Sequence, residues 1–272
     1  MPRIIRTQAI SLHSSPFAES SKIVTFYTRD FGKLNFLAKG ARRPKSKFGG
    51  ALETFTHASL IIYKPETPKL YILSDAEIIC SYSELQASTE KYLAGSQIVE
   101  FVLKATDFEE ANARLFNLLL SALNALASKQ SVKNLDSLVL AFLLKGASFL
   151  GYRPELDNCV SCRKKCAGAK IYFDFINGGI LCIKCKLNNT RAIIIEPNQI
   201  AYLKALLYFP IKRSANLMTL PELKDFILQY LKHHFERLDL AAFTLNRTDF
   251  KKSRTGQESE KIYGWTQEIV RK

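Results

Sequence analysis

The pattern of hydrophobic and polar positions changes once along the chain, near residue 80. Before that point, β-branched and aromatic residues occur in short, partly alternating runs separated by turn-forming residues, which favours β-strands. The predicted strands span residues 4–12, 22–28, 33–38, 56–63 and 69–79. Five short strands in about 80 residues indicate a small closed barrel.

Polar segments separate these runs. Residues 29–32 (Arg-Asp-Phe-Gly) and 64–68 (Lys-Pro-Glu-Thr-Pro) are typical of turns, and residues 39–47 form a longer polar loop. A five-stranded Greek-key barrel is the OB-fold, whose open face binds oligonucleotides. We therefore expect an OB-fold at the N-terminal end of the chain.

Beyond residue 83 the apolar residues recur three and four positions apart, as one face of a helix requires. The predicted helices span residues 89–108, 109–127, 135–150, 196–209 and 220–235. The third is apolar nearly all round, from Leu138 to Leu144, which marks it as the central helix of a bundle. Gly151 follows as a C-terminal cap, and Pro154 prevents continuation.

These elements predict an α+β protein in which an OB-fold barrel precedes a helical-bundle domain. We expect the barrel over residues 1–81, the helical domain over 82–246, and a basic tail over 247–272 that is a candidate for disorder. No Gly/Ser-rich linker lies at residues 80–86, so barrel and bundle should be joined closely.

A four-cysteine module, expected over residues 157–187, is inserted in the helical domain. Cys159 with Cys162, and Cys182 with Cys185, form two Cys-x-x-Cys pairs separated by nineteen residues. Each pair forms a knuckle whose thiolates point the same way, and two knuckles complete a tetrahedron. Asn177-Gly178 predicts a hairpin that carries the second pair into place. Because four thiolates leave no open position, we expect a structural Zn²⁺.

The other readings of these cysteines are a redox disulfide and an iron–sulfur cluster. Cys166 is spare, because its spacing of four from Cys162 breaks the symmetry of the pairs, and Cys80 is expected to be a small buried hydrophobe. The N-terminal residues contain no long apolar segment with a cleavage site, so we expect no signal peptide. In a reducing cytosol, Cys-x-x-Cys pairs more often bind metal or do redox work than form disulfides.

Charge points to a polyanionic partner. The chain has 39 Lys and Arg against 25 Asp and Glu, a net charge of +14, which favours nucleic acid or an anionic membrane surface. Residues 1–50 contain ten of these cations and two acids, a balance of 10 − 2 = +8. Residues 39–47 hold five cations and no acid, and these would repel one another without an anionic partner. The sequence contains no run of 18 or more apolar residues, so it predicts no membrane-spanning helix.

The cations of residues 1–50 are therefore candidate phosphate contacts. The candidate DNA-binding residues are Lys22, Lys33, Lys39, Arg42, Arg43, Lys45 and Lys47. Five aromatic residues are interleaved with them: Phe26, Tyr27, Phe31, Phe36 and Phe48. Rings beside cations can stack on bases. An aromatic residue in a small barrel is more often part of the core, however, and we leave both roles open.

Motifs for bond chemistry are missing from the sequence. It contains no P-loop, no Gly-x-Gly-x-x-Gly and no His-Glu-x-x-His, and its carboxylates do not cluster as a two-metal nuclease would require. None of the four histidines lies near the cysteines. We therefore predict a binding protein without a catalytic site.

Three blocks of sequence resemble the bacterial DNA repair protein RecO family. The first is residues 19–28 with Gly32-Lys33 and residues 38–46. The second is Gly151 to Cys159 with Cys162, and the third is Gly178 to Cys182 with Cys185. In this order and spacing the blocks are specific, and the resemblance covers roughly residues 1–245.

The resemblance implies a mediator of recombinational repair with an OB-fold, a helical domain and a zinc module. Such proteins bind single- and double-stranded DNA and anneal complementary strands. The resemblance further implies interactions with RecR and the single-strand-binding protein, and help in loading the recombinase RecA, in the cytoplasm at the nucleoid. Two alternatives stay open on the residues alone: an RNA-binding OB-fold protein of translation or RNA metabolism, and a zinc-dependent nucleic-acid hydrolase.

Overall fold

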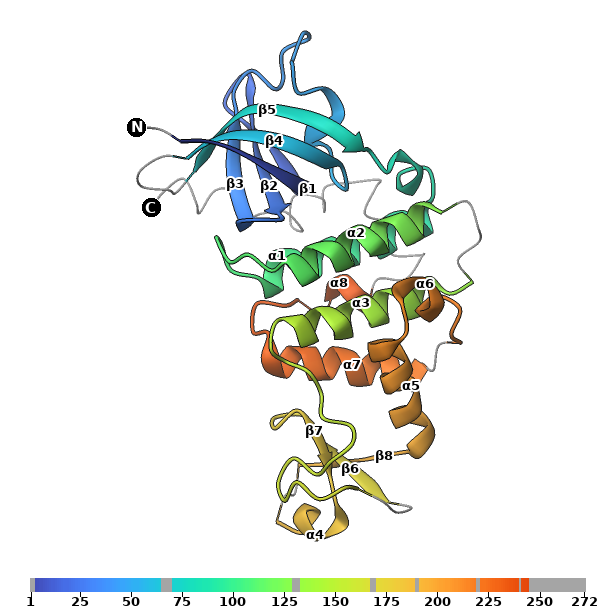
Figure 1. Cartoon of the computed structure of the whole chain (residues 1–272). Helices are drawn as coiled ribbons and strands as arrows, with labels where there is room; N and C mark the ends of the chain where they lie inside the picture. The colour runs from blue at the N-terminus through green and yellow to red at the C-terminus, as the bar shows by residue number, and fades with distance from the viewer. Residues whose placement is uncertain are drawn as a thin grey trace.

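The protein consists of a β-barrel, a layer of helices and a small three-stranded sheet, which follow one another along the long axis of the molecule (Figure 1). The computed structural model describes residues 3–64, 70–128, 133–166, 170–188, 191–218, 221–239 and 241–244. The expected turn at residues 64–68, apart from Lys64 itself, and the expected tail at residues 247–272 lie outside the described residues.

The barrel is closed by five strands. They are β1 (Arg3–Phe17), β2 (Ser21–Thr28), β3 (Gly32–Ala38), β4 (His57–Lys64) and β5 (Tyr71–Cys80). Their order is β1-β2-β3-β5-β4, with β1 also paired to β4 and a parallel contact between β3 and β5. This arrangement confirms the predicted five-stranded barrel, which is closed by a short parallel pairing of Phe36 and Leu37 with Tyr71 and Ile72.

Strand β1 is longer than the sequence pattern predicted. Its first half pairs with β4 and its second half with β2, and the register shifts between Ser11 and His13. Such an irregularity bends a strand and increases its twist, so one strand can serve both neighbours around the barrel. The continuing ladder with β2 carries β1 to Phe17, beyond the predicted end at Leu12.

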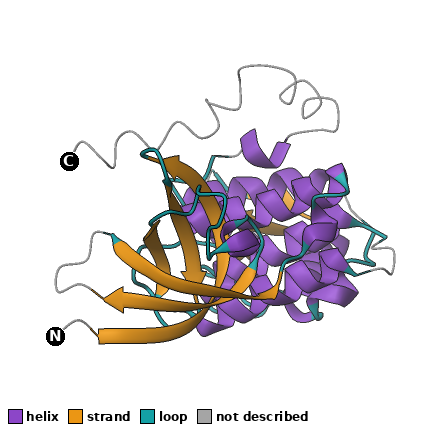
Figure 2. Cartoon of the chain, turned by 90° about the horizontal axis from the view of Figure 1, so that it is seen from above, coloured by secondary structure: helices purple, strands orange, loops and turns teal. Residues whose placement is uncertain are grey.

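The longer helices form one group beside and beneath the barrel strands, as the view from the barrel end shows (Figure 2). The longer helices are α1 (Thr89–Ala105), α2 (Ala113–Ala127), α3 (Leu135–Phe149), α5 (Pro197–Tyr208) and α7 (Pro221–His234). Shorter ones are η1 (Gly49–Leu52), η2 (Ser83–Leu85), α4 (Ile183–Lys186), α6 (Ile211–Ser214) and α8 (Ala241–Thr244). Helix α3 packs against α1, α2, α5, α6 and α7, and Leu138–Leu144 are all buried, which confirms its central position.

The start of α2 differs from the prediction. The pattern placed it at Glu109, but the helix begins at Ala113, where the Asn112 side chain accepts the backbone N–H of Leu115. The residues before it are held by the barrel instead: the Glu109 N–H donates to the Lys33 carbonyl at 3.0 Å, and Tyr71 donates to the Glu109 carboxylate at 2.8 Å. Tertiary contacts therefore override the local helical pattern here.

The barrel interior has a hydrophobic core of its own, and one side of the barrel also joins the core of the helices. Ile10, Leu12, Tyr27 and Phe55 of the barrel region belong to the same buried cluster as the helices. The β2–β3 turn also touches the segment before α2, because a Cβ on Gly32 would lie 2.0 Å from the Glu110 carbonyl oxygen. The barrel is thus packed tightly against the helical layer, as expected for a junction without a flexible linker.

A three-stranded sheet supports the cysteines at the other end of the helical layer (Figure 1). Its strands are β6 (Ile171–Asp174), β7 (Gly179–Leu181) and β8 (Ile193–Ile195), in the order β7-β6-β8. The β6–β7 hairpin confirms the turn signal at Asn177-Gly178, and Phe173 packs against Phe226 of α7 with ring centroids 4.7 Å apart. Strand β8 was not predicted, because three residues are too few to show an alternating pattern.

Lys33 connects the barrel to the end of α1. Its side chain is 3% exposed, and its Nζ donates to the carbonyls of Leu103 and Thr106 at 2.6 and 2.5 Å. The ammonium also lies 4.7 Å from the centroid of the Phe108 ring. Carbonyls at a helix C-terminus carry partial negative charge and favour a cation. Burial, followed by the nearby Arg237 charge, lowers the pKa of Lys33 to about 8.

We expect the substitution Lys33→Met to destabilise the fold by about 1–3 kcal/mol, because it leaves two buried carbonyls without a donor. Chemical unfolding followed by circular dichroism measures this change. The matched control is Lys39→Met at an exposed position, where we expect less than about 0.5 kcal/mol. Equal stabilities of the two variants would contradict the role of Lys33.

The same lysine predicts a pH dependence. The unfolded chain keeps the Lys33 proton up to its usual pKa of 10.5, whereas the folded protein releases it near pH 8. Because the unfolded state then binds more protons, the stability that depends on Lys33 should rise between about pH 8 and 10.5. The free energy of unfolding of wild type should rise relative to that of the Lys33→Met variant across that pH window. A difference between the two variants that does not change with pH would refute the lowered pKa of Lys33.

Candidate nucleic-acid interface and metal site

The basic loop, defined as residues 39–47, projects from the end of the barrel that faces away from the helices (Figure 1). It follows β3 as a series of turns: the Arg43 N–H donates to the Gly40 carbonyl at 3.1 Å, and the Ser46 N–H to the Arg43 carbonyl at 3.0 Å. Gly40 has a φ of 72°, in the left-handed region that favours glycine. The loop therefore has a defined backbone path.

Arg42 ties the basic loop to the β1–β2 turn. Its backbone N–H donates to the Ser20 carbonyl at 2.9 Å, and its guanidinium donates to the Ala18 carbonyl at 3.0 Å. A guanidinium has five N–H donors, so this contact leaves others for an anion. Arg42 is exposed, and its position is fixed before any ligand arrives.

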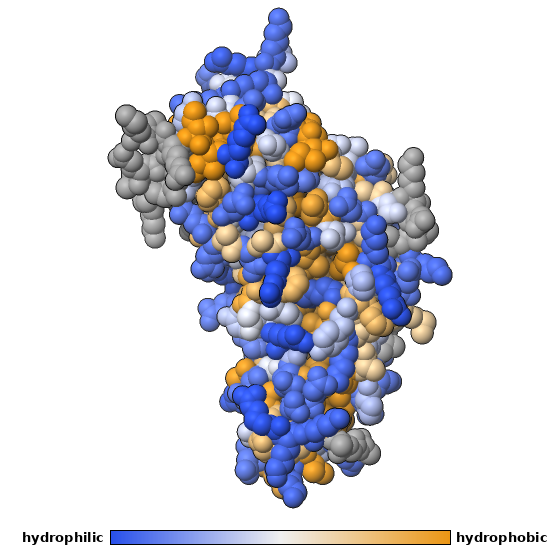
Figure 3. Space-filling view, viewed as in Figure 1, coloured by the Kyte–Doolittle hydropathy of each residue, from blue (hydrophilic) through white to orange (hydrophobic). Residues whose placement is uncertain are grey.

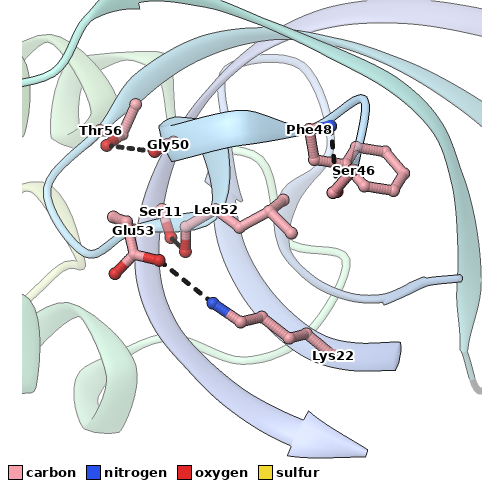
Figure 4. A network of polar contacts seen from close by, with 8 residues as sticks. All are labelled: Ser11, Lys22, Ser46, Phe48, Gly50, Leu52, Glu53 and Thr56. Atoms are coloured by element: carbon pink, nitrogen blue, oxygen red, sulfur yellow. Dashed lines mark hydrogen bonds and ion pairs between the residues drawn. The ribbon is translucent and has the colours of Figure 1, made fainter. Parts of the chain in front are cut away.

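A network of polar contacts fixes the chain directly after the basic loop (Figure 4). Ser11 donates to the Leu52 carbonyl at 3.2 Å, and Thr56 donates to the Gly50 carbonyl at 3.2 Å, so helix η1 is held against β1. Lys22 donates to Glu53 at 3.1 Å. Lys22 thus has an acidic partner inside the protein, and it is less available to a phosphate than the cations of the loop.

The structure separates the seven candidate phosphate contacts into three groups. The basic loop brings together five exposed cations: Lys39, Arg42, Arg43, Lys45 and Lys47. Within the described residues, the loop lysines and Arg43 form no ion pair with an acid. Lys22 lies beside the loop but pairs with Glu53. Lys33 is buried on the side of the barrel that faces the helices, where it donates to carbonyls at the end of α1. We therefore do not propose Lys33 as a phosphate contact.

The aromatic residues between these cations form the core of the protein. Phe26, Tyr27, Phe36 and Phe48 are 0–3% exposed, and the rings of Phe26 and Phe36 meet edge to face with centroids 5.6 Å apart. Rings buried in a core cannot stack on bases. Of the two roles left open for them, the core is the one that they fill, and Phe31 is partly buried.

Sequence reasoning missed an apolar stripe on the outer surface of the barrel. Ile4, Tyr63 and Ile72 are neighbours across β1, β4 and β5, and they are 60%, 39% and 42% exposed. Apolar surface on the barrel is visible among hydrophilic residues in Figure 3. The alternation of β4, in which Leu60 and Ile62 point inward, contained the signal that Tyr63 points outward. Tyr63 therefore offers an exposed ring that the interleaved aromatic residues do not.

Among the described residues, the four cysteines are the only group of His, Cys, Asp or Glu side chains placed to hold a metal ion. The sulfur atoms of Cys159, Cys162, Cys182 and Cys185 all lie within 4.8 Å of one another, and those of Cys162 and Cys182 are 3.8 Å apart. Four sulfurs at about 2.3 Å from zinc in a tetrahedron lie about 3.8 Å apart. The geometry therefore fits a tetrahedral thiolate site.

Backbone N–H groups favour the thiolate form of Cys159 and Cys182, one cysteine of each pair. Burial raises the pKa of Cys159, but N–H groups of Cys162, Cys182 and Ser161 outweigh it and lower the pKa to about 6. The N–H of Cys185 lowers the pKa of Cys182 in the same way. Burial and the neighbouring thiolates raise the pKa of Cys166 to about 11, so this fifth thiol stays protonated. A hydrogen bond from Ser161 lowers the pKa of Cys185, but the neighbouring thiols and burial outweigh it and raise this pKa as well. The geometry of the four sulfurs, and not these pKa shifts, therefore selects the candidate ligands.

With four protein ligands, the site would be closed and structural. Such a metal would fix the two knuckles relative to each other but could not activate a water molecule, because no coordination position is left open. No step of bond chemistry follows from this geometry.

Among the described residues, no helix is both long and apolar enough to cross a membrane.

We expect one zinc per chain, released when the thiols react with an organomercurial and detected with a chromophoric chelator. Cys182→Ser should lose most of this zinc and expose the module to trypsin, because metal binding contributes on the order of 10 kcal/mol to folding at such sites. Cys166→Ser and Cys80→Ser are the matched controls and should retain it. A Cys182→Ser variant with full zinc content would rule out the assigned ligand set.

Comparisons with known proteins cover both parts of the chain. The family model described as recombination protein O N terminal matches residues 1–82, and the one described as recombination protein O C terminal matches residues 86–242. The DNA repair protein RecO of Thermoanaerobacter sp. (strain X514) is 32% identical over 243 residues, which cover 86% of this chain and 94% of the relative. The DNA repair protein RecO of Chlorobium phaeobacteroides (strain DSM 266 / SMG 266 / 2430) is 29% identical over 244 residues, covering 85% and 91%. The chain therefore belongs to the RecO family of DNA repair proteins.

Proposed function

We propose that this protein is a DNA-binding recombination mediator in double-strand-break and gap repair, which binds and anneals single-stranded DNA. The observation that carries the proposal is the basic loop: five exposed cations on a backbone held in place by turns and by contacts to the barrel. Family membership supplies the context of DNA repair. We assign DNA binding to the barrel domain, residues 1–81, and place the helical domain at residues 82–246.

The proposed mechanism of annealing is charge neutralisation. Two DNA strands repel each other through their phosphates, and cations that replace condensed counterions lower this repulsion and release the counterions to solution. The basic loop supplies fixed positive charge at the tip of the barrel, where a flexible strand can reach it (Figure 1). Base pairing then selects the complementary strand, so the protein needs no sequence-specific contacts and performs no bond chemistry.

The proposed partners follow from the family resemblance. They are single- and double-stranded DNA, RecR and the single-strand-binding protein, with RecA loaded indirectly at gaps. The expected setting is the cytoplasm, at the nucleoid.

The RNA-binding alternative has lost support, because the relatives are named DNA repair proteins. Competition between DNA and RNA strands of one sequence decides between the two, and tighter RNA binding would reverse the choice.

The substitutions Arg42→Ala, Arg43→Ala and Lys45→Ala together should weaken binding to single-stranded DNA and flatten its salt dependence. Each phosphate contact contributes about 0.7 to the slope of log Kobs against log salt concentration, so three lost contacts should reduce the slope by about 2. Fluorescence anisotropy in a salt titration measures it. The matched control replaces three exposed helical-domain lysines, Lys133, Lys212 and Lys232, with Ala and should change the slope little. An unchanged slope in the loop variant refutes the assignment.

The same loop variant should anneal complementary strands several-fold more slowly than wild type, because it neutralises fewer phosphates. Strand pairing is followed by energy transfer between dyes on two complementary oligonucleotides, with and without single-strand-binding protein. The control variant should retain the wild-type rate. Full annealing by the loop variant would place the function on another surface.

A further inference from the structure

A second set of exposed cations surrounds the cysteines, far from the basic loop in sequence. The zinc module, residues 157–187, contains six Lys and Arg against two Asp, a balance of 6 − 2 = +4. Of the two acids, Asp157 already pairs with Lys204 at 2.5 Å, and Asp174 is buried, where it accepts the N–H groups of the β6–β7 turn. The cations of the module therefore have few acidic neighbours.

The metal knuckles place several of these cations next to one another. Arg163, Lys164 and Lys165 follow the first pair of cysteines, where the Cys159 N–H donates to the Lys164 carbonyl at 2.8 Å. Lys184 lies between the two cysteines of the second pair, at the start of α4. All four cations are exposed, and the two knuckles meet because the four sulfurs lie within 4.8 Å of one another. We call these four cations the knuckle cluster.

The negative charge of a four-thiolate metal site is too small to balance the positive charge of the zinc module. Zn²⁺ with four thiolates carries a net charge of −2, so a balance of +4 would leave +2 on the module. Within the described residues, none of the four knuckle cations forms an ion pair with an acid. Like charges held together by the fold repel one another, and an anionic partner relieves this repulsion.

The knuckle cluster and the basic loop lie at opposite ends of the molecule. The barrel stands at one end, the module at the other, and the helices separate them (Figure 1). Hydrophilic residues cover much of both ends (Figure 3). Because one side of the barrel packs into the core of the helices, the two cationic ends are held apart by a continuous packed body.

We propose that the knuckle cluster is a second binding site for the phosphate backbone of single-stranded DNA, so that one molecule holds two strands or two distant segments of one strand. This proposal rests on the proposed function of the basic loop. The ligand chemistry is that of phosphodiesters: exposed Lys and Arg on the two knuckles contact phosphate oxygens without reading bases. The metal site would then serve binding indirectly, since it keeps the two cationic knuckles side by side.

Strand bridging tests the second site directly. A biotinylated oligo-dT on streptavidin beads is incubated with protein and a fluorescent oligo-dT, which cannot pair with the first. Wild type should retain the fluorescent strand on the beads. Replacement of Lys164, Lys165 and Lys184 by Ala should reduce retention at least about tenfold, because three phosphate contacts are lost, while the protein still binds the beads through the basic loop.

Two variants complete the comparison. The Lys133, Lys212 and Lys232→Ala variant has the same change in charge and should bridge like wild type, and the knuckle variant should keep one zinc per chain. Retention by a zinc-loaded knuckle variant equal to that of wild type would overturn the second site. Loss of retention in the control variant as well would also overturn it, because bridging would then depend on overall charge.

Lysine footprinting tests the same inference on the unaltered protein. With saturating oligo-dT, acetylation of Lys164, Lys165 and Lys184 should slow at least about threefold, as should that of Lys45 and Lys47, while Lys212 and Lys232 react as before. Protection confined to the basic loop would reject the second site and leave the proposed function standing. Unprotected lysines at both ends would reject both.

Discussion

The contact between the barrel and the helical layer is the interaction on which the rest of the structure depends. Ile10, Leu12 and Tyr27 extend the core of the helices into the barrel, so the two parts form one packed body. Lys33 adds a buried polar contact at the edge of this junction by donating to carbonyls at the end of α1. A cation is tolerated there because the carbonyls replace the hydration that burial removes. The junction thereby fixes the direction in which the basic loop points.

Charge is distributed so that the exposed cations can meet an external anion. The cations of the basic loop stand at the free end of the barrel, and only Arg42 among them spends a side-chain donor on the protein itself. Lys22 and Lys33, which also precede residue 50, are used within the fold instead. Mutual repulsion raises the free energy of the uncomplexed loop, and phosphate oxygens would relieve it. Binding by charge of this kind needs no catalytic group and no base-specific pocket.

The cysteine module, residues 157–187, is a small unit that would gain stability from a bound metal. Among the described residues, the buried members of the cluster around the cysteines are Cys159, Leu181 and Ala192, which offer too little apolar surface to hold two segments together. The β6–β7–β8 sheet is anchored separately, since Phe173 and Phe175 pack against Phe226 of α7. Thiolate coordination would supply the missing stability of the cysteine module and would keep the cations of its two knuckles adjacent.

The sequence by itself determined the barrel, the central helix, the four-cysteine cluster and the basic loop, because each depends on local period, spacing or charge density. Tertiary structure decided which of the candidate cations and aromatic residues are exposed and which are buried. Lys33 and Lys39 look alike in sequence, yet one lies among α1 carbonyls and the other on the surface. Tyr63, outside the interleaved aromatic set, proved exposed, whereas Phe26 and Tyr27 are buried. The start of α2 and the existence of β8 likewise came from pairing with distant residues. Contacts between segments far apart in the chain set burial, and no local pattern records them.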